Sequence, residues 1–305
     1  MNRNICFKSL YETCHCPLNT HLVEHLPVID SHCHVDLFAS DRSFFSSLSK
    51  SSIRRIFMIN NKHNYTTWNT TFDISYQNCG VFECFGIHPK ILPEDYEFVF
   101  RLNQLENILK VKNNYLSGSP VVGVGETGLD ETSRFDMHSQ KLIFAQQVRI
   151  AKDYQLPLIL HCRGKEYFRP MLDCLLSILP SSHYIQWHCV KADSDLEVID
   201  YYLKKFPNSF ISLNRSSTLV QDIDLDKRFK KWLRNYPLLF NRLVLETDCP
   251  WLCPKDLSKE DYNPATGIFI TSKWIENVIR CSGKNASKII EIANDNAKRL
   301  FKLNI

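Results

Sequence analysis

The sequence lacks several features that would place the protein in a special class. No apolar stretch approaches the roughly 20 residues that a membrane-spanning helix requires, and there is no internal repeat or low-complexity tract. The first residues also lack the apolar core and cleavage site of a secretory signal. We therefore expect a soluble intracellular protein, in the cytoplasm, the nucleus or both, with no membrane partner.

The sequence also lacks a strong excess of either charge. Lys and Arg number 37 and Asp and Glu number 33, which gives a net charge of +4 with His neutral. This small excess does not require a polyanionic partner. It permits one if the basic residues gather near a binding site.

Cysteine, by contrast, is plentiful at 12 residues. Without a secretion signal, we expect free buried thiols rather than a disulfide framework. A structural zinc site is not expected, since Cys249 and Cys253 have no matching second pair. A cluster near the N-terminus has too short a gap between its cysteine and histidine pairs for a zinc finger; it consists of Cys14, Cys16, His21 and His25.

The length and the order of apolar runs favour a single α/β barrel. A chain of 305 residues fits one such barrel, typically about 250 residues, with short additions. Eight runs rich in Val, Ile, Leu and Phe are typical of parallel strands covered on both faces, and helix-like stretches alternate with them. We predict a (β/α)8 TIM-type barrel over 27–305, after an irregular extension over 1–26. The predicted strands are 28–32, 54–60, 80–87, 120–126, 156–162, 183–189, 208–213 and 242–248.

Helical spacing of apolar residues is clearest over 134–155, and similar patterns occur over 96–116, 166–179, 194–206 and 273–282. A further helix is predicted over 285–303. Residues 249–272 follow the last strand and are rich in Pro and Asp, so we expect them to form a long active-site loop.

Imidazole and carboxylate side chains recur at the C-terminal ends of five of these apolar runs. In a parallel barrel those ends lie on one face, so the side chains should converge. Four imidazoles and two carboxylates suit a pair of divalent metals that activate water. The six residues are His32, His34, Glu126, His161, His188 and Asp248.

Each of these residues also has an ordinary structural interpretation. His32 and His34 lie two apart on an extended strand end, where both could chelate one metal, although such pairs also occur by chance. Glu126 lies among glycines that permit close approach, and it could bridge two metals or cap a turn. Asp248 could cap the following turn, or it could ligate a metal and take a proton from water.

His161 and His188 could each be a core histidine that makes a single hydrogen bond, but their equivalent places on successive strands favour a shared site. A cysteine adjoins several of the proposed ligands. Alternation along a strand should turn these thiols toward the outer helices, whereas the rival interpretation makes them metal ligands. They are Cys33, Cys162, Cys189 and Cys249.

Several residues are candidates for substrate binding around the mouth, by which we mean the end of the barrel at which the strands end. His88 ends the third strand and could touch phosphate, and Arg163 should share the face of His161 and could pair with phosphate. Loop residues after strands six and seven are further candidates, although the ordinary interpretation of each is a solvated loop residue: Lys191, Asn214 and Arg215. Bases could stack on Trp187, Trp251 or Tyr167, of which Trp187 should rather face the helices.

With these residues in place, the chain from about residue 27 to its C-terminus resembles the TatD family of metal-dependent deoxyribonucleases, within the amidohydrolase-like barrels. Each motif is weak alone, but their order and spacing are highly specific. The motifs are DSHCHVD, FGIHPK, GVGETGLD, Gln140 in the following helix, PLILHCR, HCV, LETDCPWL and NDNAKRLF.

The resemblance implies a TIM-type barrel, two divalent cations (Mg²⁺, Mn²⁺ or Zn²⁺) and hydrolysis of nucleic-acid phosphodiesters. Carried over by motif, His32 and His34 would hold one metal together with Asp248, Glu126 would bridge both metals, and the second metal would lie on His161 and His188. A metal-activated hydroxide would attack phosphorus in line, while Asp248 orients it or accepts its proton. Asp248 and Glu126 are thus the expected catalytic residues.

Three departures from the family pattern leave these ligands intact. Glu131 and Thr132 follow GLD, Lys90 replaces a second histidine after HP, and the sixth-strand histidine stands in HCVKA. They bear on substrate preference and level of activity. The leading hypothesis is a DNA nuclease, acting as an exonuclease from a 3′ end, and a monomer is compatible with the sequence. The alternatives are a hydrolase of a small ester, amide or phosphoester, and a non-catalytic nucleic-acid-binding protein.

Overall fold

A computed structural model describes residues 26–38, 55–69, 79–112, 119–218, 221–253, 262–279 and 283–305. The predicted extension over 1–26 therefore lies outside the described residues, apart from its last residue. The cysteine and histidine cluster near the N-terminus lies outside them as well. In the described part of the chain, no helix is both long enough and apolar enough to cross a bilayer.

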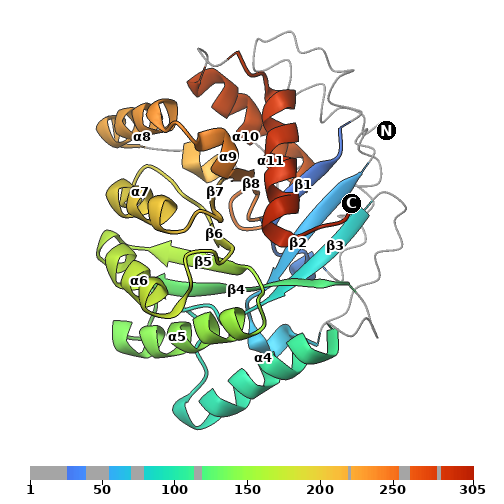
Figure 1. The fold of residues 1–305 in the computed structure, drawn as a ribbon, viewed down its shortest axis with the longest axis vertical. Helices are drawn as coiled ribbons and strands as arrows, with labels where there is room; N and C mark the ends of the chain where they lie inside the picture. The colour runs from blue at the N-terminus through green and yellow to red at the C-terminus, as the bar shows by residue number, and fades with distance from the viewer. Residues whose placement is uncertain are drawn as a thin grey trace.

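Eight parallel strands form one sheet in the order β1 to β8, and the sheet curls into a nearly closed barrel, as predicted (Figure 1). Beyond the strands, the N–H of Asp248 donates to His32 O at 2.9 Å and that of His34 donates to Cys249 O at 2.8 Å, which joins the two edges at the mouth. The strands are β1 (Val28–Cys33), β2 (Ile56–Lys62), β3 (Cys79–Phe85), β4 (Val121–Asp130), β5 (Leu158–Arg163), β6 (Ile185–Trp187), β7 (Ser209–Leu213) and β8 (Leu243–Leu245).

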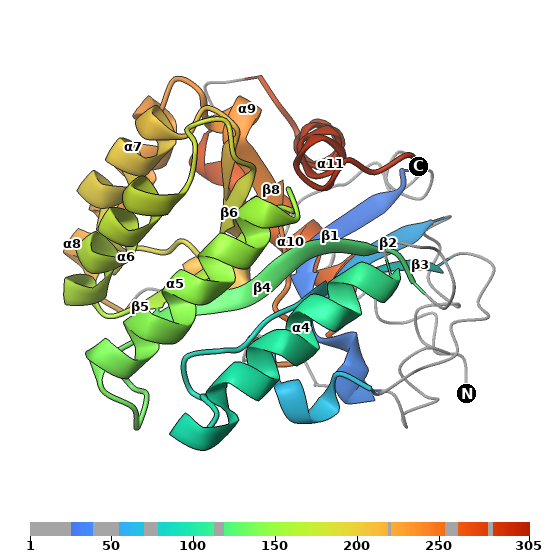
Figure 2. The ribbon, with the colours of Figure 1, turned by 60° about the horizontal axis from the view of Figure 1, so that its bottom comes forward.

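Helices cover the outside of the barrel, and Figure 2 shows α4 and α5 lying along β4. Polar side chains cap several helix N-termini by accepting hydrogen bonds from free backbone N–H groups; examples are Asp136, Asp195, Asp222 and Asn285. The helices are α4 (Phe98–Lys112), α5 (Met137–Asp153), α6 (Lys165–Ile178), α7 (Leu196–Lys205), α8 (Ile223–Asn235), α9 (Leu239–Arg242), α10 (Pro264–Val278) and α11 (Ala286–Phe301).

Two helical assignments correct the sequence analysis. The predicted loop over 249–272 is wrong in its last part, because Pro264 begins α10. Asn263 and Thr266 cap that helix reciprocally, and proline suits the first turn. Helix α8 was missed, although its buried Phe229 and Leu233 share one helical face with the partly buried Leu225 and Trp232.

The barrel interior consists of an apolar layer below a polar one. Residues two apart on a strand share a face. Ile159 and Val244 therefore point into the barrel, and so do His161 and Glu246, which lie two positions later in the chain. The apolar layer consists of Ile29, Ile59, Cys84, Val122, Ile159, Phe210 and Val244. The C-terminal part of α11 and the residues after it pack against this layer through Ala297, Leu300, Phe301 and Leu303. The polar layer therefore lies at the other end of the barrel, where the strands end.

Candidate metal centre

The structure brings the six candidate ligands together where the strands end. One group forms around one oxygen of Glu126. Its Oε2 lies 3.3 Å from His32 Nε2 and 3.4 Å from His34 Nε2. Asp248 Oδ1 adjoins the same two nitrogens, at 3.6 and 3.1 Å. Two imidazoles and two carboxylates thus face a common point.

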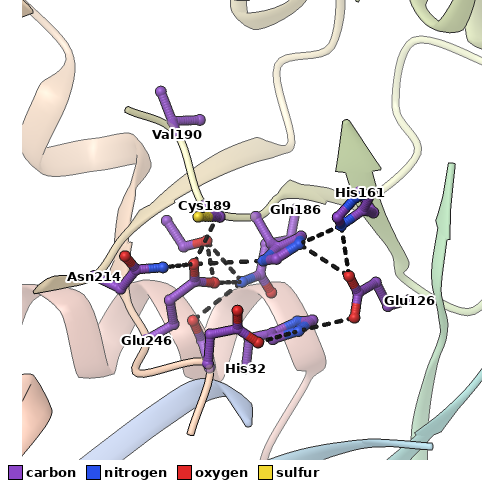
Figure 3. Close-up of polar contacts among 12 residues, drawn as sticks. His32, Glu126, His161, Gln186, Cys189, Val190, Asn214 and Glu246 are labelled. Carbon is purple, nitrogen blue, oxygen red and sulfur yellow. Dashed lines mark hydrogen bonds and ion pairs between the residues drawn. The ribbon is translucent and has the colours of Figure 1, made fainter. Parts of the chain in front are cut away.

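A second group forms around the other oxygen of Glu126. Its Oε1 lies 2.7 Å from His161 Nδ1 and 3.1 Å from His188 Nε2, and these two nitrogens are 3.1 Å apart. Figure 3 shows Glu126 between His161 on one side and His32 on the other. The two oxygens of one buried carboxylate therefore face two separate sets of imidazoles, which is the arrangement of a bridging ligand.

The donor spacing fits the size of a metal ion. Metal–nitrogen bonds of about 2.0–2.1 Å in a tetrahedral site place neighbouring donor atoms about 3.3 Å apart, and the contacts in both groups fall around that value. Both ring nitrogens of His32 are buried and lack a hydrogen-bond partner. A buried polar atom without a partner is costly, and a cation on Nε2 would remove that cost there. The residues therefore fit divalent metal ions.

In three of the imidazoles, the ring nitrogen that does not face Glu126 lies close to another oxygen atom. His34 Nδ1 lies 2.7 Å from Asn61 O, and His161 Nε2 lies 3.0 Å from Asp130 Oδ2. His188 Nδ1 lies 3.5 Å from Glu246 Oε1. An oxygen acceptor behind the ring holds the proton there and leaves the other nitrogen free to ligate. These oxygens thus orient the imidazoles toward the two groups.

Glu246 is the best-bonded carboxylate of the site. It is fully buried and accepts hydrogen bonds from Cys189 N at 2.7 Å and Asn214 Nδ2 at 2.8 Å. Gln186 Nε2 donates to it at 3.3 Å, and the Ser212 hydroxyl donates as well (Figure 3). These donors fix the carboxylate behind His188.

The clustered imidazoles and carboxylates shift one another's pKa values. Burial alone would raise the pKa of Glu126, but the imidazoles of His188 and His88 hold that pKa well below its usual range. Burial alone would lower the pKa of His34, but hydrogen bonds to Asp248 and Glu126 raise that pKa to about 10. Without a metal, protons therefore offset the negative charge of the site.

Strand lengths differ from prediction at three ligands. Glu126 lies within β4, not at its end, because β4 continues to Asp130. β6 and β8 are short, so His188 and Asp248 lie in the segments that follow them.

Gly128 has φ +155°, and a Cβ there would overlap the carbonyl oxygen of His161. Only glycine permits this close approach of β4 to β5.

The substrate-binding candidates fall into different environments. His88 is buried in the site, with Nε2 3.4 Å from Glu126 Oε1. Arg163 is exposed, and Lys191 is half-buried with its Nζ 3.4 Å from Asp193 Oδ2. Asn214 is fully buried and gives its amide to Glu246, so the structure places it behind the site instead of at the mouth.

The cysteines beside the ligands follow the expected alternation with one exception. Cys33 and Cys249 are buried in the layer between barrel and helices, and Cys162 packs against it. Cys189 does not, because its φ of +54° interrupts the alternation and its thiol lies 3.5 Å from Ser216 Oγ. All described cysteines are free, as expected: Cys33, Cys79, Cys84, Cys162, Cys174, Cys189, Cys249 and Cys253.

Sequence reasoning missed three residues of the site. Glu246 lies two residues before Asp248, and this spacing was a usable signal. Asp130 ends the GLD motif and pairs with both His161 and Lys90 Nζ, the latter at 3.4 Å. His63 follows β2, and its Nδ1 lies 2.9 Å from His34 Nδ1. No pattern in the sequence singles out His63.

Asp130→Asn should lower the affinity for a divalent cation by about 10- to 100-fold, the usual cost of losing a carboxylate behind a ligating histidine. The amide can present its N–H₂ to His161 Nε2, which disfavours the tautomer with Nδ1 free. Calorimetric titration of the metal-free protein with Mn²⁺ measures the effect. Asp153→Asn, at an exposed position in α5, is the matched control. Equal affinities of the two variants would rule out this role for Asp130.

A family model described as TatD-related DNase matches residues 29–302. The protein named 3′-5′ ssDNA/RNA exonuclease TatD from Rahnella sp. (strain Y9602) is 30% identical over 187 residues, which are 60% of this chain and 66% of that protein. The human 3′-5′ RNA nuclease TATDN2 is 25% identical over 90% of this chain and 35% of its own length. The human deoxyribonuclease TATDN3 is 24% identical over 90% and 94%. The chain thus spans less than two-thirds of the length of each of the first two relatives.

Solved structures share the barrel. YJJV, a TatD homologue from Escherichia coli K12, superposes with a TM-score of 0.63 at 20% identity and covers 92% of this chain and 99% of its own. The phosphotriesterase homology protein from Escherichia coli reaches 0.60 at 12% identity, over 92% and 98%. At these identities the likeness concerns the fold alone. The family-model match, which extends over almost the whole chain, shows that the chain belongs to the TatD-related DNase family.

Proposed function

We propose that the protein is a metal-dependent nuclease that hydrolyses phosphodiester bonds of DNA and removes nucleotides from a 3′ end. The observation that carries the proposal is the position of Glu126, whose two oxygens face two separate ligand groups, with Asp248 beside one of them. Membership of the family supports the phosphodiester as substrate. The names of two relatives, a 3′-5′ ssDNA/RNA exonuclease and a deoxyribonuclease, support the direction and the nucleic acid.

The proposal assigns two divalent cations to the site. His32, His34 and Asp248 would hold one cation together with Oε2 of Glu126. His161 and His188 would hold the other with Oε1 of Glu126. When bound, such cations supply Lewis acidity, which lowers the pKa of water and neutralises phosphate oxygens. The donor set of imidazoles and carboxylates accommodates Zn²⁺, Mn²⁺ or Mg²⁺.

In the proposed reaction, Asp248 accepts the proton of the attacking water. Its side chain is 13% exposed, whereas those of His32 and Glu126 are 0% and 4% exposed. The imidazoles of His34, His32 and His188 hold the pKa of Asp248 below its usual value against the effect of burial. The carboxylate is therefore ionised at neutral pH and partly exposed, so it has a free lone pair that can accept a proton.

His88 is suited to donate a hydrogen bond while uncharged. Burial and the charge of His161 lower its pKa to about 4. Its Nδ1 accepts a hydrogen bond from Lys90 N at 3.1 Å, which places the proton on Nε2, toward the site. In the proposed reaction this N–H binds a phosphate oxygen, and the cationic groups of Lys90, Arg163 and Lys191 bind phosphates farther out.

A nuclease assay with a panel of metals tests the proposal. The metal-free protein is supplied with Mg²⁺, Mn²⁺ or Zn²⁺ and single-stranded DNA labelled at its 5′ end. Stepwise shortening of the labelled strand from the 3′ end is the expected result, and matched RNA measures preference for the sugar. Cleavage of small esters or amides without release of nucleotides would favour the alternative hydrolase. Binding of DNA without any cleavage would favour the non-catalytic alternative.

The affinity for the cations should rise with pH. Because the pKa of His34 is raised to about 10 in the metal-free protein, this imidazole is protonated at pH 7 and must lose its proton to ligate. Affinity should therefore increase by up to about tenfold per pH unit for each displaced proton, from pH 6 to 9. Calorimetry with Mn²⁺ in buffers of different ionisation enthalpy measures the protons released. A pH-independent affinity with no proton release would contradict the assigned protonation.

A further inference from the structure

Two tight turns leave the site side by side. The strand-end hydrogen bonds between His32 and Asp248 and between His34 and Cys249 hold the two segments together. Leu37 N then donates back to His34 O at 3.2 Å, and Trp251 N donates back to Asp248 O at 2.8 Å. Each turn thus places its next side chains at the rim of the site, three residues beyond a candidate ligand.

Large apolar side chains on both turns are open to solvent. Trp251 is 61% exposed and Leu37 is 45% exposed. The chain has five tryptophans, all within the described ranges, and the other four are buried or half-buried. Trp187 illustrates the contrast, since it is 1% exposed and stacks on Phe168 at 5.2 Å. Trp251 is thus the one exposed tryptophan of the chain, and it lies three residues beyond a candidate ligand.

Three cationic side chains of the mouth lie elsewhere around the ring, whereas a fourth, Arg215, follows β7 beside β8. Lys90 and Lys191 follow β3 and β6, and Arg163 is the last residue of β5. Trp251 and Leu37 follow β8 and β1, which close the barrel on the other side. A single strand of nucleic acid has phosphates along one side and bases along the other. Cations on one side of the mouth and an exposed indole on the other match that polarity.

We infer that Trp251 stacks on a nucleobase of the bound strand, next to the phosphodiester at the candidate metal centre, with Leu37 as the apolar edge of the same subsite. The ligand class is an unpaired nucleobase of either sugar type. Stacking on an aromatic ring tolerates all bases, so the subsite favours frayed or single-stranded ends over paired ones. This inference rests on the proposed nuclease function.

Trp251→Ala is expected to raise KM for single-stranded DNA by about 5- to 100-fold, the range for loss of one base–aromatic stack, with kcat changed less than threefold. Trp251→Phe should restore most of the affinity because it keeps an aromatic face. Tyr201→Ala removes another exposed aromatic side chain, on the outer helix α7, and is the matched control with no expected change.

An abasic substrate makes the test specific. If Trp251 stacks on a base, removal of the base next to the cleaved bond should raise KM in the wild-type protein and leave KM of Trp251→Ala unchanged. Equal KM values for wild type and Trp251→Ala would overturn the inference. An equal loss of kcat on intact and abasic substrates would also overturn it, since it would assign Trp251 to support of the Asp248 turn. Failure of the wild-type protein to cleave any nucleic acid would instead refute the proposed function.

Discussion

Glu126→Gln should abolish cation binding and reduce nuclease turnover by about a thousandfold or more, as expected when a water-activating site is dismantled. The amide keeps the shape of the side chain but loses the negative charge that both ligand groups share. It also replaces one of the two oxygens with an N–H₂ group, which cannot ligate. The side chain is only 4% exposed, so water cannot take the place of the missing oxygen at low cost.

Elemental analysis of the purified protein and single-stranded DNA cleavage measure the two effects together. Glu197→Gln is the matched control, because it removes the same charge from an exposed residue on the outer helix α7. That variant should retain both the metal and the activity. A Glu126→Gln protein with normal metal content would show that Glu126 does not bridge the two groups, whatever its effect on turnover.

Asp248→Asn should reduce kcat by about 10²- to 10⁴-fold, the range for loss of a positioned general base. Binding of single-stranded DNA should change less than threefold. The physical reason is that the amide cannot accept the proton of the attacking water, although it can still occupy the same turn. Since Asp248 Oδ1 also adjoins His34 Nε2 at 3.1 Å, the metal content must be measured for the same preparation.

The control for this variant is Asp173→Asn, which neutralises a 53% exposed carboxylate on α6. Fluorescence anisotropy of a labelled oligonucleotide separates binding from turnover. Turnover at the wild-type rate in Asp248→Asn would remove Asp248 from the mechanism. A parallel loss of DNA binding and turnover would assign it to substrate binding instead.

The barrel was predictable because each of its strands is a short apolar run and the runs alternate with helical patterns. The ligands were predictable for the same reason, since they end or follow those runs. Helix α8 was predictable in the same way, because Leu225, Phe229, Trp232 and Leu233 recur at helical spacing. It was missed because charged residues separate these positions and leave no continuous apolar run.

The groups behind the ligands were harder to predict than the ligands themselves. The position of Asn214 behind Glu246 depends on the distance between β7 and β8, which no local pattern contains. Cys189 departs from prediction because a single positive φ reverses the direction of its side chain. The relation of His63 to His34 likewise depends on the spacing of two strand ends. Such details are set by the tertiary structure and not by the sequence around each residue.

The hydrogen bonds that join β1 to β8 have a consequence for folding. His34 and Asp248 are 214 residues apart in the chain, and their side chains meet only when the first and last strands lie edge to edge. A cation held by both residues would link the first and last strands, so it would bind the closed barrel in preference to an open one. By mass action it would then stabilise the closed ring. With such a cation, closing the barrel and binding the metal would be parts of one equilibrium.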